Sequence, residues 1–255
     1  MRPSERVHIA PLGFERDRVV EAAKQLKADR LILLEWGEGE RPPFVEELYE
    51  DIEAAGIDRE IRSCNIFDLY EVVRVTAREI QQHTDDDVFV NIATGSKISA
   101  IGGMIACMVT DAVPYYVEPE RYGEKDAQRV KPVSHGVKNI KELPAYPIDA
   151  PETQLIYVME YIYRNGPVTK KELIDFGQGN GKSIPAGTPA EGLPFITDHE
   201  ADSDRARYRL LETHVLEPLA EKGFIQTKEV GRRTDVDLTE EGENTLSAFR
   251  HLIET

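Results

Sequence analysis

The chain has 255 residues, enough for one large domain or two ordinary ones, and its 40% apolar content is enough for packed cores. Its 47 acidic residues exceed its 31 basic residues, for a formal net charge of −16. This charge argues against nucleic-acid binding by the chain as a whole, but not by a locally basic segment.

The first half alternates strand and helix patterns in the order βαβαβαβαβ. Continuous apolar runs predict strands at 7–10, 31–34, 88–92 and 113–117 and a weaker one at 60–63, and helical spacing predicts helices at 19–26, 44–55, 69–80 and 98–108. Continuous apolar strands are typical of a sheet that is buried on both faces. The sequence therefore predicts an α/β fold with a parallel, doubly wound, Rossmann-like sheet. In it, Ile98, Ile101, Ile105 and Met108 are expected to line a buried helix.

A polar segment, 122–139, can hold one more strand or a loop, and a stiff linker with three prolines follows at 144–151. We place a domain boundary there. Residues 1–145 form the expected ligand-sensing domain, and residues 146–255 form the second domain.

The second half predicts helices, a β-hairpin and a final helix. A helix at 155–162 is followed by a short helix at 170–176, which Thr169 caps, and by a Gly/Pro-rich loop at 177–194. A longer helix begins at Ser203 or Asp204, has Leu210, Leu211 and Val215 on its inward face, and is expected to kink at Glu217-Pro218. Strands at 224–230 and 235–238 form the hairpin, and Thr239 caps the last helix. This order is that of a winged helix-turn-helix.

Basic residues gather in this second domain. Arg205 and Arg209 are four residues apart and share one face of the predicted recognition helix. The candidate contacts to double-stranded DNA are Lys170, Lys171, Arg205, Arg207, Arg209, Arg232 and Arg233, the last two at the hairpin tip. A solvated basic helix face is the alternative interpretation.

The strongest strand of the first domain ends in the turn Thr94-Gly-Ser-Lys97, and the first strand ends in a turn at Gly13 and Phe14. Ligands of open α/β sheets bind beyond the carboxyl ends of the strands, where backbone N–H groups at helix starts attract anions. The candidate ligand residues are Gly13, Phe14, Thr94, Gly95, Ser96 and Lys97. Helix capping by Ser96 is a compatible alternative.

Other motifs do not match known chemistry. The segment 177–183 lacks the first glycine of a P-loop, the acids at 198–204 lack EF-hand spacing, and neither GxGxxG nor GxSxG occurs. We therefore predict no catalytic residue, metal or cofactor. Cys64 and Cys107 form no CxxC pair and are expected in the core. No apolar run reaches a membrane-spanning length, and MRPSERVHIA lacks a signal-peptide core, so we expect a cytoplasmic protein.

The stretch Asn91-Ile-Ala-Thr-Gly-Ser-Lys97 resembles the Asn-Ile-Thr-Gly-Gly-Thr-Lys signature of CARF (CRISPR-associated Rossmann fold) domains. A CARF-like domain followed by a winged helix resembles the archaeal CARF regulators, and haloarchaeal relatives would fit the acidity. Ala93 and Thr94 depart from the signature. The resemblance implies a homodimer with a pocket across its two-fold axis, a cyclic oligoadenylate ligand such as cyclic tetra-adenylate, and DNA as a partner.

Three functions remain open from the sequence. The first is a dimeric, ligand-responsive transcriptional regulator. The second, which the resemblance implies because some relatives cleave the bound ring, is a ring nuclease that degrades cyclic oligoadenylate. Cleavage needs a positioned 2′-hydroxyl and charge stabilisation, for which Ser96 and Lys97 could serve. The third is a CARF-like module whose winged helix serves only for dimerisation.

Overall fold

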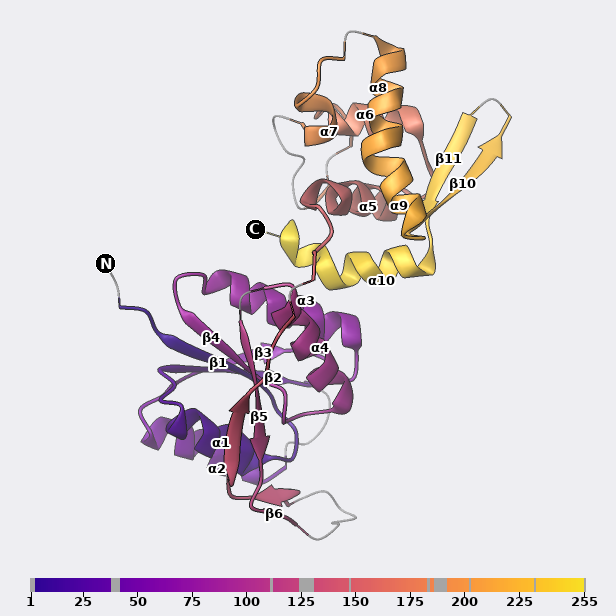
Figure 1. The fold of residues 1–255 in the computed structure, drawn as a ribbon. Helices are drawn as coiled ribbons and strands as arrows, with labels where there is room; N and C mark the ends of the chain where they lie inside the picture. The colour runs from indigo at the N-terminus through magenta and orange to yellow at the C-terminus, as the bar shows by residue number, and fades with distance from the viewer. Residues whose placement is uncertain are drawn as a thin grey trace. The chain divides into compact units, whose positions relative to one another are not determined.

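The computed structural model shows a chain of two compact units, Met1–Asp149 and Ala150–Thr255 (Figure 1). The structure describes residues 3–37, 42–110, 112–123, 131–146, 148–182, 184–185, 192–201, 203–231 and 233–254.

The N-terminal unit is built on a six-stranded sheet with the order β3-β2-β1-β4-β5-β8. Its strands are β1 (Arg6–Pro11), β2 (Arg30–Glu35), β3 (Asp58–Ser63), β4 (Asp87–Asn91), β5 (Val113–Glu118) and β8 (Asn139–Glu142). The first five are parallel, and β8 pairs antiparallel with β5. The predicted Rossmann-like parallel sheet is confirmed.

Helices cover both faces of this sheet (Figure 1). They are α1 (Arg16–Gln25) and α2 (Phe44–Ala54) on one face, and α3 (Leu69–Gln82) and α4 (Lys97–Met108) on the other. Side chains of β2 alternate between the two layers: Leu31 and Leu33 pack with α1 and α2, and Ile32 and Leu34 pack with α3 and α4. Burial on both faces explains why this strand is continuously apolar from Leu31 to Leu34.

The strand order places a topological switch at β1. The chain leaves β1 for β2 on one side, and after β3 it returns to β4 on the other side of β1. The segments that follow β1 and β4 therefore lead to opposite faces of the sheet. Open α/β sheets bind ligands in the crevice that such a divergence leaves at the carboxyl ends of the strands.

The packing of α4 corrects one prediction. Its buried face consists of small residues, Ser99, Gly102, Gly103, Ala106 and Cys107. The expectation that Ile98, Ile101, Ile105 and Met108 line the buried face is wrong. Ile98 is 37% exposed and Ile101 52% exposed, and the other two are half-buried. Small residues allow α4 to approach α3 closely: a Cβ on Gly102 would lie 2.7 Å from Cγ1 of Val72.

The polar segment after β5 folds back onto the first β–α turn. It contains a two-stranded ribbon, β6 (Arg121–Tyr122) and β7 (Ser134–His135). The N–H of Val133 donates to the carbonyl of Phe14 at 2.9 Å, and the N–H of Gly136 donates to Oδ2 of Asp17 at 2.9 Å. The ribbon thus holds the start of α1 in place.

The C-terminal unit has the predicted winged-helix order. Its elements are α5 (Thr153–Asn165), β9 (Val168–Thr169), α6 (Lys170–Gly177), α7 (Pro194–Thr197), α8 (Asp204–Leu211), the π-helical turn η1 (Glu212–Leu216), α9 (Glu217–Glu221), β10 (Ile225–Val230), β11 (Arg233–Leu238), α10 (Glu240–Phe249) and the 3₁₀ turn η2 (Arg250–Leu252). Strands β10, β11 and β9 form a three-stranded antiparallel sheet. The β10–β11 hairpin is the wing (Figure 1).

The predicted recognition helix is one helical run from α8 through η1 to α9. Ser203 caps its start, accepting from the N–H of Ala206 at 3.3 Å. The irregularity expected at Pro218 is the π-helical turn η1, because proline has no N–H to donate to the carbonyl four residues before it. Leu211 and Val215 are buried as predicted, whereas Leu210 is half-buried.

The connection between α6 and α8 is far longer than the ~3–4 residues of a simple helix-turn-helix. The sequence predicted only a loop there, but α7 anchors the connection in the core. Phe195 of α7 is 1% exposed, and a Cβ on Gly177 would lie 2.4 Å from its Cζ. In the described part of the chain, no helix combines the length and apolar character needed to cross a bilayer.

Candidate functional site

The turns after β1 and β4 touch each other backbone to backbone. A Cβ on Gly13 would lie 2.8 Å from Cα of Gly95. Gly95 has a φ of +79°, and its own Cβ would lie 2.7 Å from Cβ of Pro11. Both positions therefore need glycine, and Gly95 needs it for its conformation as well. The structure thus brings together the two turns that the sequence singled out separately.

Asn91, the last residue of β4, holds the second turn in register with α1. Its side chain is fully buried, donates to the carbonyl of Arg18 at 3.0 Å, and accepts from the N–H of Ala93 at 2.9 Å. A buried amide that satisfies two backbone groups on different elements fixes their relative position. The asparagine of the signature therefore has a structural role at the crevice.

Glu15 places a carboxylate between the two turns. Its Oε2 accepts a hydrogen bond from the N–H of Gly95 at 3.1 Å. Burial raises the pKa of Glu15, although this hydrogen bond and the charge of Arg18 act in the opposite direction. Sequence reasoning missed this residue, because only the fold brings it to Gly95. The available indication was an acidic residue at the end of the first turn.

The start of α4 offers positive charge at the same place. Ser96 caps the helix, accepting from the N–H of Ser99 at 2.9 Å, and its Oγ donates to the carbonyl of Ile66. Lys97 is the first helical residue, is exposed, and makes no ion pair with the described residues. A lysine there adds to the positive end of the helix dipole, so an anion nearby would be stabilised by both.

Thr94 and Phe14 are the two remaining candidate residues of these turns. Thr94 is 2% exposed, and its Oγ1 has no hydrogen-bond partner among the described residues. A buried hydroxyl without a partner is rare in folded proteins. The ring of Phe14 packs against Phe44 with centroids 5.9 Å apart, and its carbonyl accepts from the N–H of Val133.

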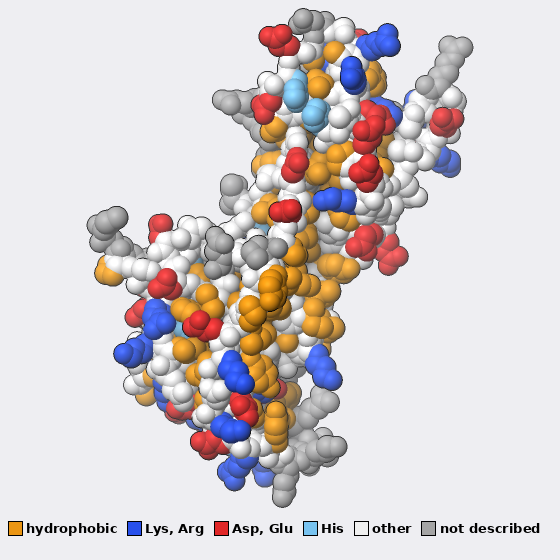
Figure 2. All heavy atoms as spheres, in the orientation of Figure 1, with side chains coloured by type: hydrophobic (Ala, Val, Ile, Leu, Met, Phe, Trp, Pro, Cys, Tyr) orange, Lys and Arg blue, Asp and Glu red, His pale blue; other side chains and the backbone are white. Residues whose placement is uncertain are grey.

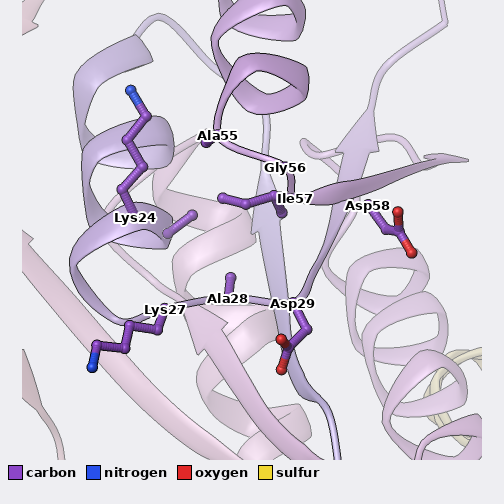
Figure 3. Close-up of a pocket in the computed structure, with 9 residues that line it drawn as sticks. Lys24, Lys27, Ala28, Asp29, Ala55, Gly56, Ile57 and Asp58 are labelled. Carbon is purple, nitrogen blue, oxygen red and sulfur yellow. The ribbon is translucent and has the colours of Figure 1, made fainter.

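A separate hollow lies at the opposite edge of the sheet, where β2 and β3 begin (Figure 3). It is lined by Lys24, Lys27, Ala28, Asp29, Ala55, Gly56, Ile57 and Asp58 among others. The amino ends of parallel strands are not where such sheets bind ligands. We therefore keep the crevice at Gly13 and Gly95 as the candidate site.

The candidate nucleic-acid interface lies on α6, α8 and the wing. Lys171, Arg205 and Arg209 are exposed and make no ion pair within the described residues. Tyr208 on α8 is 40% exposed, and sequence reasoning did not single it out. Three such cations on two neighbouring helices form a local basic surface in an acidic chain.

The other basic candidates are partly engaged. Lys170 pairs with Glu212 at 2.6 Å, Arg207 with Asp204 at 3.1 Å, and Arg233 with Asp235 at 3.1 Å. Arg233 is the first residue of β11, and Arg232 lies outside the described residues. Lys170 is half-buried in its pair, so it is a weaker candidate for phosphate contact than Lys171.

Two family models match the chain, one in each unit. Residues 6–122 match the model described as HFX_2341_N-like, N-terminal, and residues 154–250 match the DUF6293 C-terminal winged helix domain. The predicted order, a Rossmann-like domain followed by a winged helix domain, is confirmed.

The individual proteins that resemble this chain share little of its sequence. The uncharacterized protein MJ1513 of Methanocaldococcus jannaschii is 25% identical over 217 residues, 70% of this chain and 65% of that protein. Can2 from Sulfobacillus thermosulfidooxidans, solved in complex with cyclic tetra-adenylate, has a TM-score of 0.40 at 11% identity, covering 96% of this chain and 62% of its own. Protein VC1899 from Vibrio cholerae has a TM-score of 0.39 at 12% identity, covering 97% of this chain and 65% of its own. The chain thus spans less than two thirds of each, and similarity this distant transfers no function.

Proposed function

We propose that this chain, an HFX_2341_N-like domain joined to a DUF6293 winged helix domain, is a ligand-responsive, DNA-binding transcriptional regulator. The observation that carries the proposal is the contact of the Gly13 and Gly95 turns at the switch point of the sheet. It joins the two turns from which a ligand site would be built, in a chain that also has a winged helix domain.

The ligand is a cyclic oligoadenylate or a similar nucleotide. The resemblance of the segment 91–97 to the CARF signature supports this class. The physical support is the exposed Lys97 at a helix start, which has no ion pair within the described residues, and the unpartnered Oγ1 of Thr94. Together they suit the phosphates and hydroxyls of a nucleotide better than an apolar ligand.

A homodimer completes the crevice. The residues Ile98, Ile101, Ile105 and Met108 of α4 form a half-exposed apolar face, and Ile148 joins it through a 2.8 Å hydrogen bond from its N–H to the carbonyl of Met108. Figure 2 shows hydrophobic side chains gathered on this side of the unit. Exposed apolar patches of this kind are typical of subunit interfaces. Because α4 begins at Lys97, pairing through this face would bring two ligand turns toward one axis.

DNA contact comes from the winged helix domain. The face of α8 with Arg205 and Arg209 enters the major groove, Lys171 reaches a phosphate, and the wing adds Arg233. Ligand bound by the dimer biases the placement of the two winged helices. A coupling of about 1–3 kcal/mol would change operator affinity roughly 5- to 150-fold.

The test is fluorescence anisotropy with the promoter of the protein's own gene, with and without cyclic tetra-adenylate, across potassium chloride concentrations. We expect specific binding that the nucleotide shifts. Absence of specific binding at every salt concentration would contradict the DNA function. An affinity that is the same with and without the nucleotide would contradict the coupling. Chromatography of the incubated nucleotide completes the test, since linear products would make the protein a ring nuclease.

A further inference from the structure

Two aromatic rings stand exposed at the carboxyl edge of the same sheet. Trp36 follows β2 directly, and Phe67 lies just before α3. Their ring centroids are 5.3 Å apart in an edge-to-face arrangement, yet Trp36 remains 46% exposed and Phe67 56% exposed. Large aromatic side chains normally gain stability by burial, so a paired but exposed couple suggests contact with a molecule outside the chain.

The loop that carries Phe67 is held by its own hydrogen bonds. The N–H of Phe67 donates to Oδ1 of Asn65 at 3.1 Å, and the N–H of Asn65 donates to Oε1 of Glu71 at 3.1 Å. Asp68 then caps α3. A ring presented by a fixed loop loses little conformational entropy when a ligand stacks on it.

The same loop is joined to the candidate ligand turn. The hydroxyl of Ser96 donates to the carbonyl of Ile66, the residue before Phe67. Trp36 emerges from β2, two strand positions from β4, which is about 10 Å in a sheet. The aromatic pair and the turn at Gly95 therefore line one continuous edge.

We propose that Trp36 and Phe67 form a stacking platform for a nucleobase of the ligand, and this inference rests on the proposed function. Bases stack on aromatic side chains without needing hydrogen-bond readout, and an edge-to-face pair leaves a ring face free. Two rings are too small to serve as a subunit interface, which buries about 800 Å² per partner. The free face of one ring has the size that a single stacked nucleobase needs.

Trp36 is the single tryptophan of the chain, so its emission reports on this place alone. The wild-type protein is titrated with cyclic tetra-adenylate, with adenosine and with inorganic phosphate. We expect saturable quenching by cyclic tetra-adenylate, weaker quenching by adenosine and none by phosphate. Emission that changes with protein concentration in the absence of nucleotide would mean that a second copy covers the rings, and would overturn the platform.

Calorimetry of the variants Trp36→Leu and Phe67→Leu then measures the contribution of each ring. We expect cyclic tetra-adenylate to bind roughly 5- to 150-fold more weakly to each, as for the removal of one base–aromatic stack. The unfolding temperature should stay near that of wild type, because both rings are largely exposed. Tyr163→Leu, a 49% exposed aromatic on α5, is the matched control and should bind normally.

The two proposals fail differently. Wild-type affinity in both variants would overturn the platform and leave the regulator intact. No nucleotide binding by the wild-type protein in calorimetry would remove the nucleotide ligand of the proposed function and the platform with it.

Discussion

Glu15 and Gly95 are joined by a 3.1 Å hydrogen bond from the backbone N–H of Gly95 to Oε2 of Glu15, across the two turns of the crevice. A carboxylate thus accepts from a backbone amide in the turn that precedes α4. In the proposed nucleotide site, this carboxylate would oppose a phosphate at the same amide and favour a hydroxyl or amino donor.

Glu15→Gln should bind cyclic tetra-adenylate about tenfold more tightly at pH 7, because the variant removes a negative charge and keeps an acceptor for Gly95. In the wild type, affinity should rise as pH falls through the raised pKa of Glu15, since protonation removes the same charge. Calorimetry across pH measures both effects.

Glu21→Gln is the matched control, because this acid of α1 has a side chain 45% exposed that pairs with Lys24, and it should change neither the affinity nor its pH dependence. The free energy of unfolding should change with pH in the same direction as the affinity. A raised pKa means that ionised Glu15 disfavours the folded state above that pKa, so the penalty is relieved as pH falls. An unchanged pH profile in Glu15→Gln would show that another group governs it.

Gly95→Ala should lower the free energy of unfolding and abolish nucleotide binding. The new Cβ would lie 2.6 Å from Oγ of Ser99 and 2.7 Å from Cβ of Pro11, and the φ of +79° adds strain of about 1–3 kcal/mol. Gly56→Ala is the control: its φ is +70°, but nothing lies within 4 Å of the added Cβ. Urea denaturation should therefore show the larger destabilisation at Gly95, and equal destabilisation would mean that the turns do not touch.

Arg205→Glu together with Arg209→Glu should weaken operator binding at least ~10-fold. The slope of log affinity against log salt should fall by about 1 for each phosphate that the variant no longer neutralises. Both arginines are exposed, so the fold should tolerate the change. The double variant Lys24→Glu with Lys141→Glu changes the net charge equally in the other unit and should retain binding. If the two double variants weaken binding alike, net charge rather than the α8 face controls it.

Ile101→Glu should convert the dimer to a monomer, because it places a charge in the apolar face of α4. Ile101 is 52% exposed, so the fold of the subunit should not suffer. Sedimentation equilibrium measures the effect, with Ile61→Glu, 39% exposed on β3, as the control that should leave the mass unchanged. A wild-type protein that sediments as a monomer would reject this interface.

Much of the architecture could be predicted from local patterns. Apolar runs such as 31–34 identified buried strands, and capping residues such as Thr169 and Ser203 marked helix starts that the structure contains. The Gly-Ser-Lys turn after β4 was likewise visible, because strand, glycine and cap lie next to one another in the chain. These features depend on neighbours within one or two turns, which the sequence contains in full.

The face of α4 could not be predicted in this way. Its spacing shows an apolar side, but only the close approach of α3 to Gly102 reveals that the small residues face inward and that Ile98 and Ile101 are left outside. A hydrophobic period identifies a stripe without saying which neighbour, if any, covers it.

By itself the sequence determined two domains, their order and the turns from which a site could be built, because strand, helix and cap preferences act locally. Only the tertiary structure decided that Gly13 lies against Gly95, that Glu15 occupies an amide of the crevice, and that Trp36 meets Phe67. These pairs are separated by many residues in the chain. They meet because the order of parallel strands carries the ends of β1, β2 and β4 to one edge of the sheet, and that order follows from the packing of whole helices rather than from any local run of residues.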